Sequence, residues 1–470
     1  MCGVVGVHAP GQDAAALAAL GIFALQHRGQ ESAGVAVSDG SGVMVYKDLG
    51  LVEQVLDERR LQSLRGSAAI AHCRYSTTGS TVWENSQPAF RLGPERQVAV
   101  GHNGNLVNTR ALLELLPGGK SWMVGTTDTE LLTALLAAEP AADLLDALLS
   151  LLPRVSGAYS LVVMDERRVI GVRDPFGFRP LVLGRLPADS GDGWCLASET
   201  CGLEALGAEY VRDVEAGEIV VLGETGGPRS IRFAEGREQL CVFELIYFAR
   251  PDSYMLGRNL YEVRRRMGEA LAAEAPAEAD LVMPVPDTGA PAAAGYAEAS
   301  GTPYREGMVR NRYAGRTFIQ PSNGMRQRGV TVKLSALREQ VRGRRLVVVD
   351  DSIVRGTTTR QIVSLLRRAG AREIHLRISA PPIFHPCFYG IDTQIETELI
   401  ASTRSVDEIR DFVGADSLAY LSIGGVLDAI DLPRERFCFA CFDGRYPVPV
   451  PYDPGNHKFV LEADPLVVAG

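Results

Sequence analysis

Residues 344–359 read RRLVVVDDSIVRGTTT, a short apolar run followed by two acidic residues and a loop rich in glycine and threonine. The apolar run is β-branched and does not alternate with polar residues, which is typical of a parallel strand covered on both faces. Apolar side chains at helical spacing follow, before a glycine that stops the helix: Ile362, Leu365, Leu366, Ala369 and then Gly370. The segment predicts a strand, a loop and a helix of a doubly wound parallel sheet within an α/β protein.

The loop after this strand has the composition of an anion site. A loop of glycine and threonine at a helix N-terminus offers unpaired N–H groups and the positive end of the helix dipole, which favour a phosphate. Asp350 and Asp351 stand at the strand end beside it and suit ribose hydroxyls and Mg²⁺. Two acids in a solvated turn are the alternative, and these residues alone favour neither interpretation.

A second segment of the same kind lies upstream, where the apolar run 281–283 is followed by VPDTGAPAA at 285–293. Together the two segments resemble the binding motifs of type I phosphoribosyltransferases. The resemblance implies a pyrophosphate loop containing Asp287 and Thr288, and it groups Thr288 with Asp350 and Asp351 around Mg²⁺. It also implies that the 5-phosphate is bound by the loop residues Arg355, Gly356, Thr357, Thr358 and Thr359.

A basic, glycine-containing run lies between these two segments, from 310 to 322, and continues to Arg328 and Lys333. Such a loop is either a solvated connection or a lid that closes over an anion. The motifs on either side favour the lid, in which Arg316 and Lys333 would contact the phosphorylated substrate.

At the other end of the chain, the sequence begins Met1-Cys2-Gly3. Removal of Met1, which we expect to be the only maturation step, leaves Cys2 with a free α-amine. One residue would then carry both a thiol nucleophile and a base of near-neutral pKa. The alternative is that Cys2 is a small buried residue that opens a strand.

Three polar segments follow apolar runs, at 26–30, 72–77 and 102–105, and we expect each to be a strand end or turn with its polar groups directed outward. Asn103 and the Gly104 N–H suit the oxyanion of an amide-cleaving cysteine. Arg74 and Asp128 suit the α-carboxylate and α-amine of glutamine. The alternatives are a surface ion pair for Arg74 and a helix N-cap for Asp128.

The motifs CGVVG, QHRGQE, HCRYSTTG, HNGNL and TTDTE, in this order, resemble the N-terminal-nucleophile glutamine amidotransferase family. The resemblance covers the first half of the chain and implies a four-layer αββα sandwich. It also implies that Cys2 forms a γ-glutamyl thioester and releases ammonia. Arg74 and Asp128 would then hold glutamine, and Asn103 with Gly104 would form the oxyanion hole.

Both halves in this order are similar to the amidophosphoribosyltransferase family. The resemblance implies that ammonia displaces pyrophosphate from phosphoribosyl pyrophosphate to give 5-phosphoribosylamine, the first step of purine synthesis. It also implies a homotetramer inhibited by purine nucleotides. We expect a glutaminase domain at 2–235, a phosphoribosyltransferase domain with a cysteine cluster at 236–450 and a C-terminal tail at 451–470. Turn-rich residues 223–228 are a candidate boundary, and residues 271–279 are expected to be helical.

Two alternatives to this function remain. One is a catalytically silent regulatory or binding paralogue. The other is a different N-terminal-nucleophile amidotransferase, although the chain has neither a sugar-isomerase half nor a Ser-Gly-Gly nucleotide loop.

Composition limits the class of protein. The 470 residues carry a net charge of −9, which argues against a nucleic-acid binder. The first apolar run, 14–25, is too short to span a membrane and has no secretory n-region before it. We therefore expect a soluble cytoplasmic protein that binds neither nucleic acid nor membranes.

The eight cysteines divide unequally. Cys73, Cys195 and Cys201 lie in or beside apolar strands and are expected to be packing residues. The remaining thiols downstream of Cys2 include a CxxC pair: Cys241, Cys387, Cys438 and Cys441. Four thiolates can bind Zn²⁺ or a [4Fe–4S] cluster, and the residues alone leave a metal site and a metal-free core equally open. The resemblance implies a structural [4Fe–4S] cluster held by these four.

Overall fold

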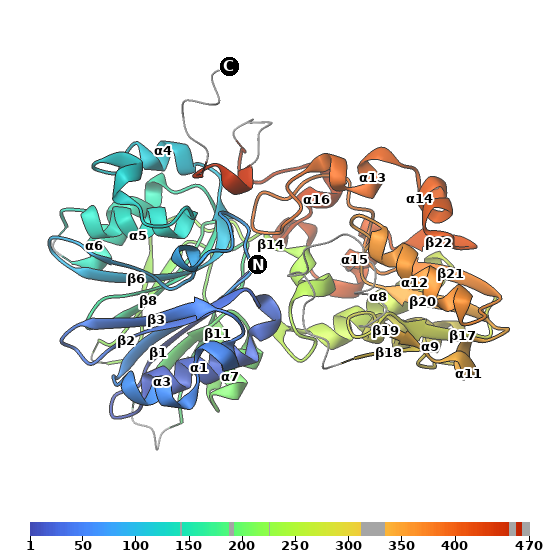
Figure 1. Ribbon diagram of the computed structural model, residues 1–470, viewed down its shortest axis with the longest axis horizontal. Coiled ribbons are helices and arrows are strands. Elements are labelled where there is room, and N and C mark those ends of the chain that lie inside the picture. The colour runs from blue at the N-terminus through green and yellow to red at the C-terminus, as the bar shows by residue number, and fades with distance from the viewer. Residues whose placement is uncertain (142, 188–191, 225, 312–333, 451–456, 463–470) are drawn as a thin grey trace.

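The computed structural model describes residues 1–141, 143–187, 192–224, 226–311, 334–450 and 457–462. Two α/β halves lie side by side, and the N-terminus lies between them (Figure 1). The first half holds two antiparallel sheets and the second a parallel one.

The seven-stranded sheet of the first half has β1 and β4 near its centre. In spatial order its strands are β11 (Glu209–Asp213), β9 (Val182–Arg185), β10 (Trp194–Ala197), β1 (Gly3–His8), β4 (Ala68–Arg74), β2 (Ser32–Ser38) and β3 (Val43–Leu49). The first strand, β1, pairs with β4 so that Gly3 lies opposite Cys73. The predicted nucleophile therefore stands at the start of a central strand, beside the end of its neighbour.

The six-stranded sheet packs face to face with the first. Its strands, in spatial order, are β13 (Arg229–Arg232), β12 (Glu218–Leu222), β8 (Val169–Arg173), β7 (Gly157–Met164), β6 (Gln97–Leu106) and β5 (Ala89–Leu92). Buried side chains of both sheets, such as Val4, Ile70 and Val162, form the layer between them.

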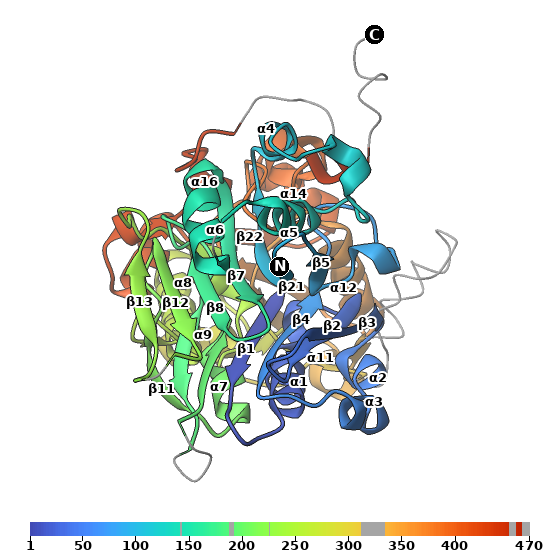
Figure 2. The same ribbon diagram turned by 90° about the vertical axis from the view of Figure 1, so that its left-hand side faces the viewer.

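Helices cover the two outer faces. On the seven-stranded sheet lie α1 (Ala14–Ala24), α2 (Val52–Val55), α3 (Glu58–Ser63) and α7 (Thr200–Ala205), and on the six-stranded sheet lie α4 (Thr109–Leu113), α5 (Asp128–Ala138) and α6 (Leu144–Leu151). Figure 2 shows these layers edge-on. The expected αββα sandwich is confirmed.

The second half is built on a parallel sheet in the order β17 (Leu281–Pro284), β20 (Arg345–Asp350), β21 (Glu373–Ile378) and β22 (Ser417–Tyr420). Along β20, Leu346 and Val348 enter one core while Val347 and Val349 enter the other. This division explains the unbroken apolar run, because each strand face meets helices.

Helices cover both faces of this sheet. One face carries α8 (Leu260–Glu274), α9 (Ala290–Ser300) and α15 (Ile423–Ile430), and the other carries α11 (Arg338–Val341), α12 (Thr357–Arg368), α13 (Ile400–Thr403) and α14 (Val406–Val413). The predicted strand, loop and helix at 344–370 are therefore confirmed, as is the doubly wound sheet.

Short elements join the halves. They are β14 (Leu240–Cys241), the π-helix η6 (Glu244–Phe248), the hairpin β15 (Tyr254–Met255) with β16 (Arg258–Asn259), and β23 (Phe437–Cys438), which precedes α16 (Ala440–Asp443). In the parallel pair of β14 and β23, Cys241 lies opposite Cys438.

Two expectations about the chain's organisation are wrong. Residues 223–228 connect β12 and β13, which are paired neighbours in one sheet, so this turn is a hairpin and not a domain boundary. Helix α8 ends at Glu274, so most of 271–279 is not helical, because Pro276 disfavours the helical conformation of the residue before it. The boundary predicted at 235/236 stays a prediction.

Within the described residues, none of the helices combines the length and the apolar composition needed to cross a membrane.

Candidate active sites

The first candidate site is a small polar pocket at the start of β1. Cys2 is 5% exposed and lines this pocket together with Arg74, Gly104 and Asp128. The structure thus brings four of the five predicted glutaminase residues into one cavity. Seven further residues line it: Tyr75, Thr77, Thr78, Gln87, His102, Thr127 and Thr129.

The fifth residue, Asn103, contacts Cys2 directly. The Cys2 backbone N–H donates to Asn103 Oδ1 at 3.1 Å, while the buried Asn103 Nδ2 has no partner among the described residues. A buried amide donor without a partner is costly unless something occupies it. A free amide donor on a residue that contacts Cys2 is the kind of group that an oxyanion needs.

Gly104 is required for a steric reason. Its φ is +156°, and a Cβ built there would lie 2.0 Å from the carbonyl oxygen of Ala158. A side chain at this position would push the strand apart beside the pocket, so only glycine fits.

Arg74 is 2% exposed, so the surface-ion-pair alternative is wrong. Its guanidinium donates to the carbonyls of Thr78 (2.9 Å), Ser80 (3.2 Å) and Gly79 (3.3 Å). Burial lowers the pKa of Arg74, and the charge of Cys2 opposes that shift. A buried cation that lines the pocket and is held by loop carbonyls is suited to bind a substrate carboxylate.

Asp128 begins α5 but does not cap it, so the N-cap alternative is also wrong. The N-cap is Thr127, whose side chain accepts from the Glu130 N–H at 3.1 Å. Asp128 Oδ2 accepts from the Leu106 N–H at 3.0 Å, and Oδ1 accepts from the Thr129 N–H at 2.9 Å. The carboxylate is therefore fixed in the pocket, opposite in charge to Arg74.

The polar segments at 72–77 and 102–105 are buried, contrary to the expected outward direction. His72, His102 and Asn103 are at most 2% exposed. His72 belongs to β4 of the seven-stranded sheet, and His102 and Asn103 belong to β6 of the six-stranded sheet. These two strands pack against each other where the sheets meet, so the polar groups at their ends are directed inward and not toward the solvent.

The nitrogen of Cys2 is an amide while Met1 is present. Met1 itself is buried, and desolvation lowers the pKa of its amine to about 5. Burial raises the pKa of the Cys2 thiol. Removal of Met1 would convert the backbone nitrogen of Cys2 from an amide into a free α-amine. That maturation stays a prediction.

The second candidate site lies at the carboxyl end of β20. Asp350 and Asp351 are both buried, so the solvated-turn alternative is wrong. Thr288 Oγ1 donates to Asp351 Oδ2 at 2.5 Å, which joins the loop after β17 to the loop after β20. Burial and the charge of Asp351 raise the pKa of Asp350 well above its usual range. Two adjacent buried carboxylates favour a bound cation.

The loop that follows these carboxylates leads directly into the N-terminus of α12. The residue before it, Gly356, has φ +72°, and the helix has no side-chain cap and no acidic residue in its first turn. Its first residues, Thr357 and Thr358, are exposed and Thr359 is buried. The expected phosphate loop therefore has the predicted form of an uncapped helix start.

Two residues predicted to bind the phosphorylated substrate, Asp287 and Arg355, have exposed side chains. The side chain of Asp287 is 75% exposed and pairs with Arg310 at 3.1 Å, and Arg355 pairs with Glu398. Arg316 and Lys333 lie outside the described residues. The run expected to form the lid lies between β18 (Met308–Arg310) and β19 (Leu334–Ala336), which pair antiparallel, and residues 312–333 of it lie outside the described residues.

The four downstream cysteines line one cavity together with Phe178, Tyr389, Ile391, Ala440 and Tyr446. All four are buried and form no disulfide. Burial raises the pKa of the Cys241 thiol to about 11, while the Arg179 charge opposes that shift. No group of three or more His, Cys, Asp or Glu side chains in the described part of the chain meets the criteria for holding a metal ion. A four-thiol donor set nevertheless fits zinc or an iron–sulfur cluster.

A segment of the second half, 388–394, touches the glutaminase pocket. Asn105 Nδ2 donates to the Phe388 carbonyl at 2.9 Å, and Gln394 Nε2 donates to the Thr77 carbonyl at 3.2 Å. A Cβ on Gly390 would lie 3.1 Å from the backbone of Gly104. Sequence reasoning missed this segment, because no local signal says which loop of one domain meets the other.

The C-terminal tail also reaches the pocket loop. Glu462 Oε1 accepts from the Ser80 N–H at 2.6 Å and from Thr126 Oγ1 at 2.9 Å, and the Lys458 carbonyl accepts from the Gly79 N–H at 2.7 Å. Gly79 and Ser80 are two of the residues whose carbonyls hold Arg74. Glu462 therefore fixes the loop from one side while Arg74 holds it from the other.

The two sites define a glutamine amidotransferase joined to a phosphoribosyltransferase, and comparison with protein families agrees. A family described as a glutamine amidotransferase domain matches residues 72–205, and one described as a phosphoribosyl transferase domain matches residues 256–382.

The chain belongs to the amidophosphoribosyltransferase family. It is 51% identical to the amidophosphoribosyltransferase of Synechococcus elongatus, covering 98% of this chain and 94% of the relative. It is also 51% identical to that of Mycobacterium tuberculosis, covering 98% of this chain and 89% of the relative.

Two solved structures are similar over nearly the whole chain. One, described as the allosteric regulatory enzyme of purine biosynthesis, has a TM-score of 0.91 at 44% identity and covers 99% of this chain and all of that one. The other is the glutamine phosphoribosylpyrophosphate amidotransferase from B. subtilis complexed with ADP and GMP, with a TM-score of 0.89 at 44% identity, covering 96% of this chain and 98% of that one.

Proposed function

We propose that this protein hydrolyses glutamine at Cys2 and transfers the ammonia to carbon 1 of phosphoribosyl pyrophosphate, with release of pyrophosphate. The observation that carries the proposal is the pocket that unites Cys2, Arg74 and Asp128, touched by a segment of the phosphoribosyltransferase half. The test is glutamine-dependent release of pyrophosphate by the purified protein, with 5-phosphoribosylamine as the second product. No release would favour a silent regulatory paralogue.

In the glutaminase reaction, each pocket residue has a separate role. The amine of mature Cys2 takes the thiol proton, and the thiolate attacks the carbonyl carbon of the glutamine side-chain amide. The tetrahedral intermediate then breaks its C–N bond, the ammonium of Cys2 returns the proton to the leaving nitrogen, and ammonia departs to leave a γ-glutamyl thioester. The Asn103 amide and the Gly104 N–H stabilise the oxyanion, Arg74 binds the substrate carboxylate, and Asp128 binds the substrate amine. Water then releases glutamate and regenerates the thiol.

In the second reaction, charge neutralisation is the main requirement. We propose that Thr288, Asp350 and Asp351 hold Mg²⁺, which when bound neutralises the pyrophosphate leaving group. The N-terminus of α12, from Arg355 to Thr359, binds the 5-phosphate through backbone N–H groups. Asp287, Arg316 and Lys333 complete the substrate contacts in this proposal.

Ammonia has to move between the two sites without escaping into water, where it would be mostly ammonium and lack a lone pair. The segment 388–394 contacts Thr77 of the glutaminase pocket and Asn105, the residue after Gly104, which supports a direct passage beside it. Excluding water from that path is the chemical reason for joining two active sites in one chain.

The tail contact yields a first prediction. Glu462→Ala removes the acceptor of the Ser80 N–H, and a hydrogen bond to a charged group contributes about 1.5–3 kcal/mol. The loop that supports Arg74 should loosen, and the KM for glutamine should rise by about tenfold. The KM for phosphoribosyl pyrophosphate should not change.

The matched control for this variant is Glu274→Ala. Glu274 likewise accepts from a serine, from the Ser422 N–H at 2.8 Å and from Ser422 Oγ at 2.7 Å, but it lies at the end of α8 in the second half. Its replacement should leave the KM for glutamine unchanged. Steady-state kinetics with each substrate varied in turn would check the prediction. An unchanged KM for glutamine in Glu462→Ala would remove the tail from the glutamine site.

For the four cysteines we propose a structural [4Fe–4S] cluster. Supporting observations are their shared cavity and the nearby Arg179 guanidinium, whose pKa is raised because Cys241, Glu244 and Cys387 offset the effect of burial. Such a cluster ties together segments distant in sequence and contributes to folding. Protein purified without oxygen is expected to be brown, and loss of the cluster in air should inactivate both half-reactions.

Iron, sulfide and zinc analysis of anaerobically purified protein decides the matter. Cys438→Ser should lose the metal, while Cys195→Ser, which changes a buried thiol of β10, should keep it. Stoichiometric zinc would favour the alternative centre. A metal-free, fully active enzyme would show that the four cysteines are packing residues.

The B. subtilis structure contains ADP and GMP, as its description states. We propose that purine nucleotides bind and inhibit this enzyme and that it forms a homotetramer. Nucleotide titrations of activity and sedimentation of the purified protein test these two proposals separately.

A further inference from the structure

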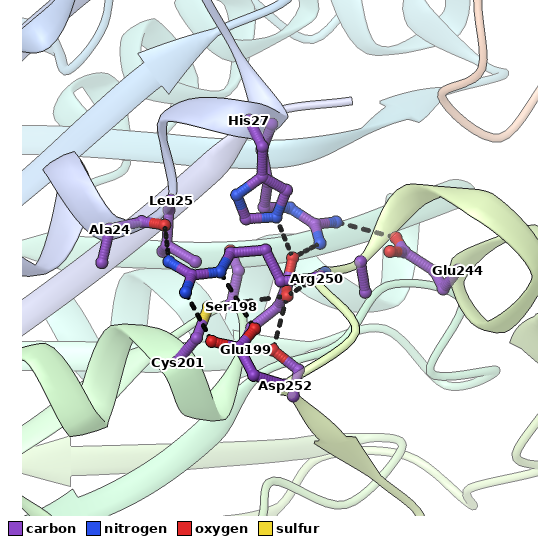
Figure 3. A network of polar contacts seen from close by, with 12 residues as sticks. Ala24, Leu25, His27, Ser198, Glu199, Cys201, Glu244, Arg250 and Asp252 are labelled. Carbon is purple, nitrogen blue, oxygen red and sulfur yellow. Dashed lines mark hydrogen bonds and ion pairs between the residues drawn. The ribbon is translucent and has the colours of Figure 1, made fainter. Parts of the chain in front are cut away.

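A buried ion network lies at the junction of the two halves, outside the pocket itself (Figure 3). At its centre, Arg28 is fully buried and uses all three nitrogens of its guanidinium. Nε donates to the Cys2 carbonyl at 2.9 Å, Nη1 donates to Glu199, and Nη2 donates to Glu244 Oε1 at 2.8 Å. One side chain therefore connects the backbone of the nucleophile to two buried carboxylates.

The first carboxylate, Glu199, lies at the start of α7 in the glutaminase half. It accepts from His27 Nε2 at 2.7 Å, from the Arg250 N–H at 2.9 Å and from Ser253 Oγ at 2.7 Å. Figure 3 shows Glu199 between His27 and Arg250. Its pKa is lowered because His27 and Arg28 more than offset the effect of burial.

The second carboxylate, Glu244, belongs to η6, the segment that follows β14 and leads into the second half. Besides Arg28, it accepts from Arg179 Nη1 at 3.3 Å. Arg179 in turn donates through Nε to the Tyr389 carbonyl at 2.9 Å. Tyr389 lies in the 388–394 segment that touches the pocket, so Glu244 and Tyr389 hold Arg28 and Arg179 from the other half.

The geometry points to Glu244 as a positioning residue for Cys2. Through Arg28 it holds the main chain of the nucleophile from the phosphoribosyltransferase half, so that the thiol stands correctly only when the two halves are packed together. This inference rests on the proposed function of Cys2 and goes beyond it, because it assigns control of the nucleophile to a residue outside the pocket.

The charges explain why the acid is needed. Arg28 and Arg179 are two buried cations, and Glu199 and Glu244 are two buried anions. Removing one anion would leave a buried cation uncompensated, which is more disruptive than losing one hydrogen bond. Arg28 would then be free to shift toward other acceptors, and its bond to the Cys2 carbonyl would shift with it.

The test is Glu244→Gln, which keeps shape and removes the charge. The kcat for glutamine hydrolysis should fall by at least about tenfold, since a small misplacement of a reacting group has effects of this size. The KM for glutamine should stay within about twofold, because Arg74 and Asp128 are unchanged. Synthesis from external ammonia should also stay within about twofold and reports that the variant is folded.

Glu218→Gln is the matched control, because Glu218 is also a buried carboxylate, paired with Arg212, but lies in β12 away from Cys2. It should leave the kcat for glutamine unchanged. Glu244→Asp, which retains the charge, should recover part of the lost rate, and it replaces Glu244→Gln if that variant does not fold.

Two results would overturn the inference: an unchanged kcat in Glu244→Gln, or an equal loss of the ammonia-dependent reaction, which would mean a general folding role. Measurements on the wild-type protein distinguish these results from a failure of the proposed function. Glutamine hydrolysis alone suffices to test Glu244, whereas absence of phosphoribosylamine from wild-type protein would refute the proposed function instead.

Discussion

Cys2→Ala is expected to lower glutamine-dependent synthesis of phosphoribosylamine by at least about 10³-fold, because the variant lacks the thiol that forms the covalent intermediate. Synthesis supported by high external ammonia should remain, since the second site requires only a free amine. The alanine would lose the two hydrogen bonds between the thiol and the Tyr75 backbone, both at 3.5 Å, and hydrogen bonds to sulfur are weak. The variant should therefore fold normally.

A comparison with Cys73→Ala shows whether the effect is chemical. Cys73 lies opposite Gly3 on β4 and is fully buried, but it does not line the pocket. Its replacement should lower stability and leave glutamine-dependent turnover largely intact. Glutamine-supported synthesis that persists in Cys2→Ala would refute the assignment of the nucleophile.

Asp350→Asn and Asp351→Asn are expected to lower both the glutamine-dependent and the ammonia-dependent activities, by about 10²-fold or more. The reason is that each change removes charge where Mg²⁺, ribose and pyrophosphate meet, and metal stabilisation of a leaving group contributes several kcal/mol. Hydrolysis of glutamine measured alone should be much less affected. If either variant spared the ammonia-dependent rate, its role at the phosphoribosyl site would have to be abandoned.

These losses should not result from unfolding. The pKa of Asp350 is raised by burial and by its neighbour Asp351, so removing one of two adjacent buried charges relieves repulsion. The unfolding temperature of Asp350→Asn, measured without divalent cations, should equal or exceed that of the wild type. Asp280→Asn is the control. Asp280 directly precedes β17 and accepts from the Arg345 N–H at 2.8 Å, at the end of β20 opposite to Asp350. Its replacement should leave both activities unchanged.

Local patterns predicted the secondary structure around both sites well. The strand at 345–350 and the helix from Thr357 were evident because an unbroken β-branched run and an apolar helical face are both properties of neighbouring residues. Where a prediction from local sequence was wrong, a contact between residues distant in the chain determined the structure. The turn at 223–228 has the composition of a linker, but its flanking strands pair with each other.

The direction of the polar groups was also decided at long range. His102 and Asn103 look like residues of an exposed strand end, yet the partner sheet covers them. Burial excluded the surface ion pair for Arg74, because the end of β4 is covered by β6 and does not stand at an exposed edge. For Asp128, the N-cap alternative failed because the Thr127 side chain caps α5 instead.

The sequence by itself determined the two kinds of chemistry, because a terminal cysteine, a two-acid strand end and a glycine–threonine loop keep their reactivity wherever they lie. It also determined which segments form the strands and helices that carry them. The tertiary structure alone decided that Glu462 contacts the loop beside the glutaminase pocket, that the 388–394 segment contacts Thr77 of the pocket, and that Glu244 contacts Arg28 outside it. The physical reason is that hydrogen bonds and ion pairs act over a few ångströms, whereas these partners are separated by hundreds of residues and meet only when the two halves are folded and packed together.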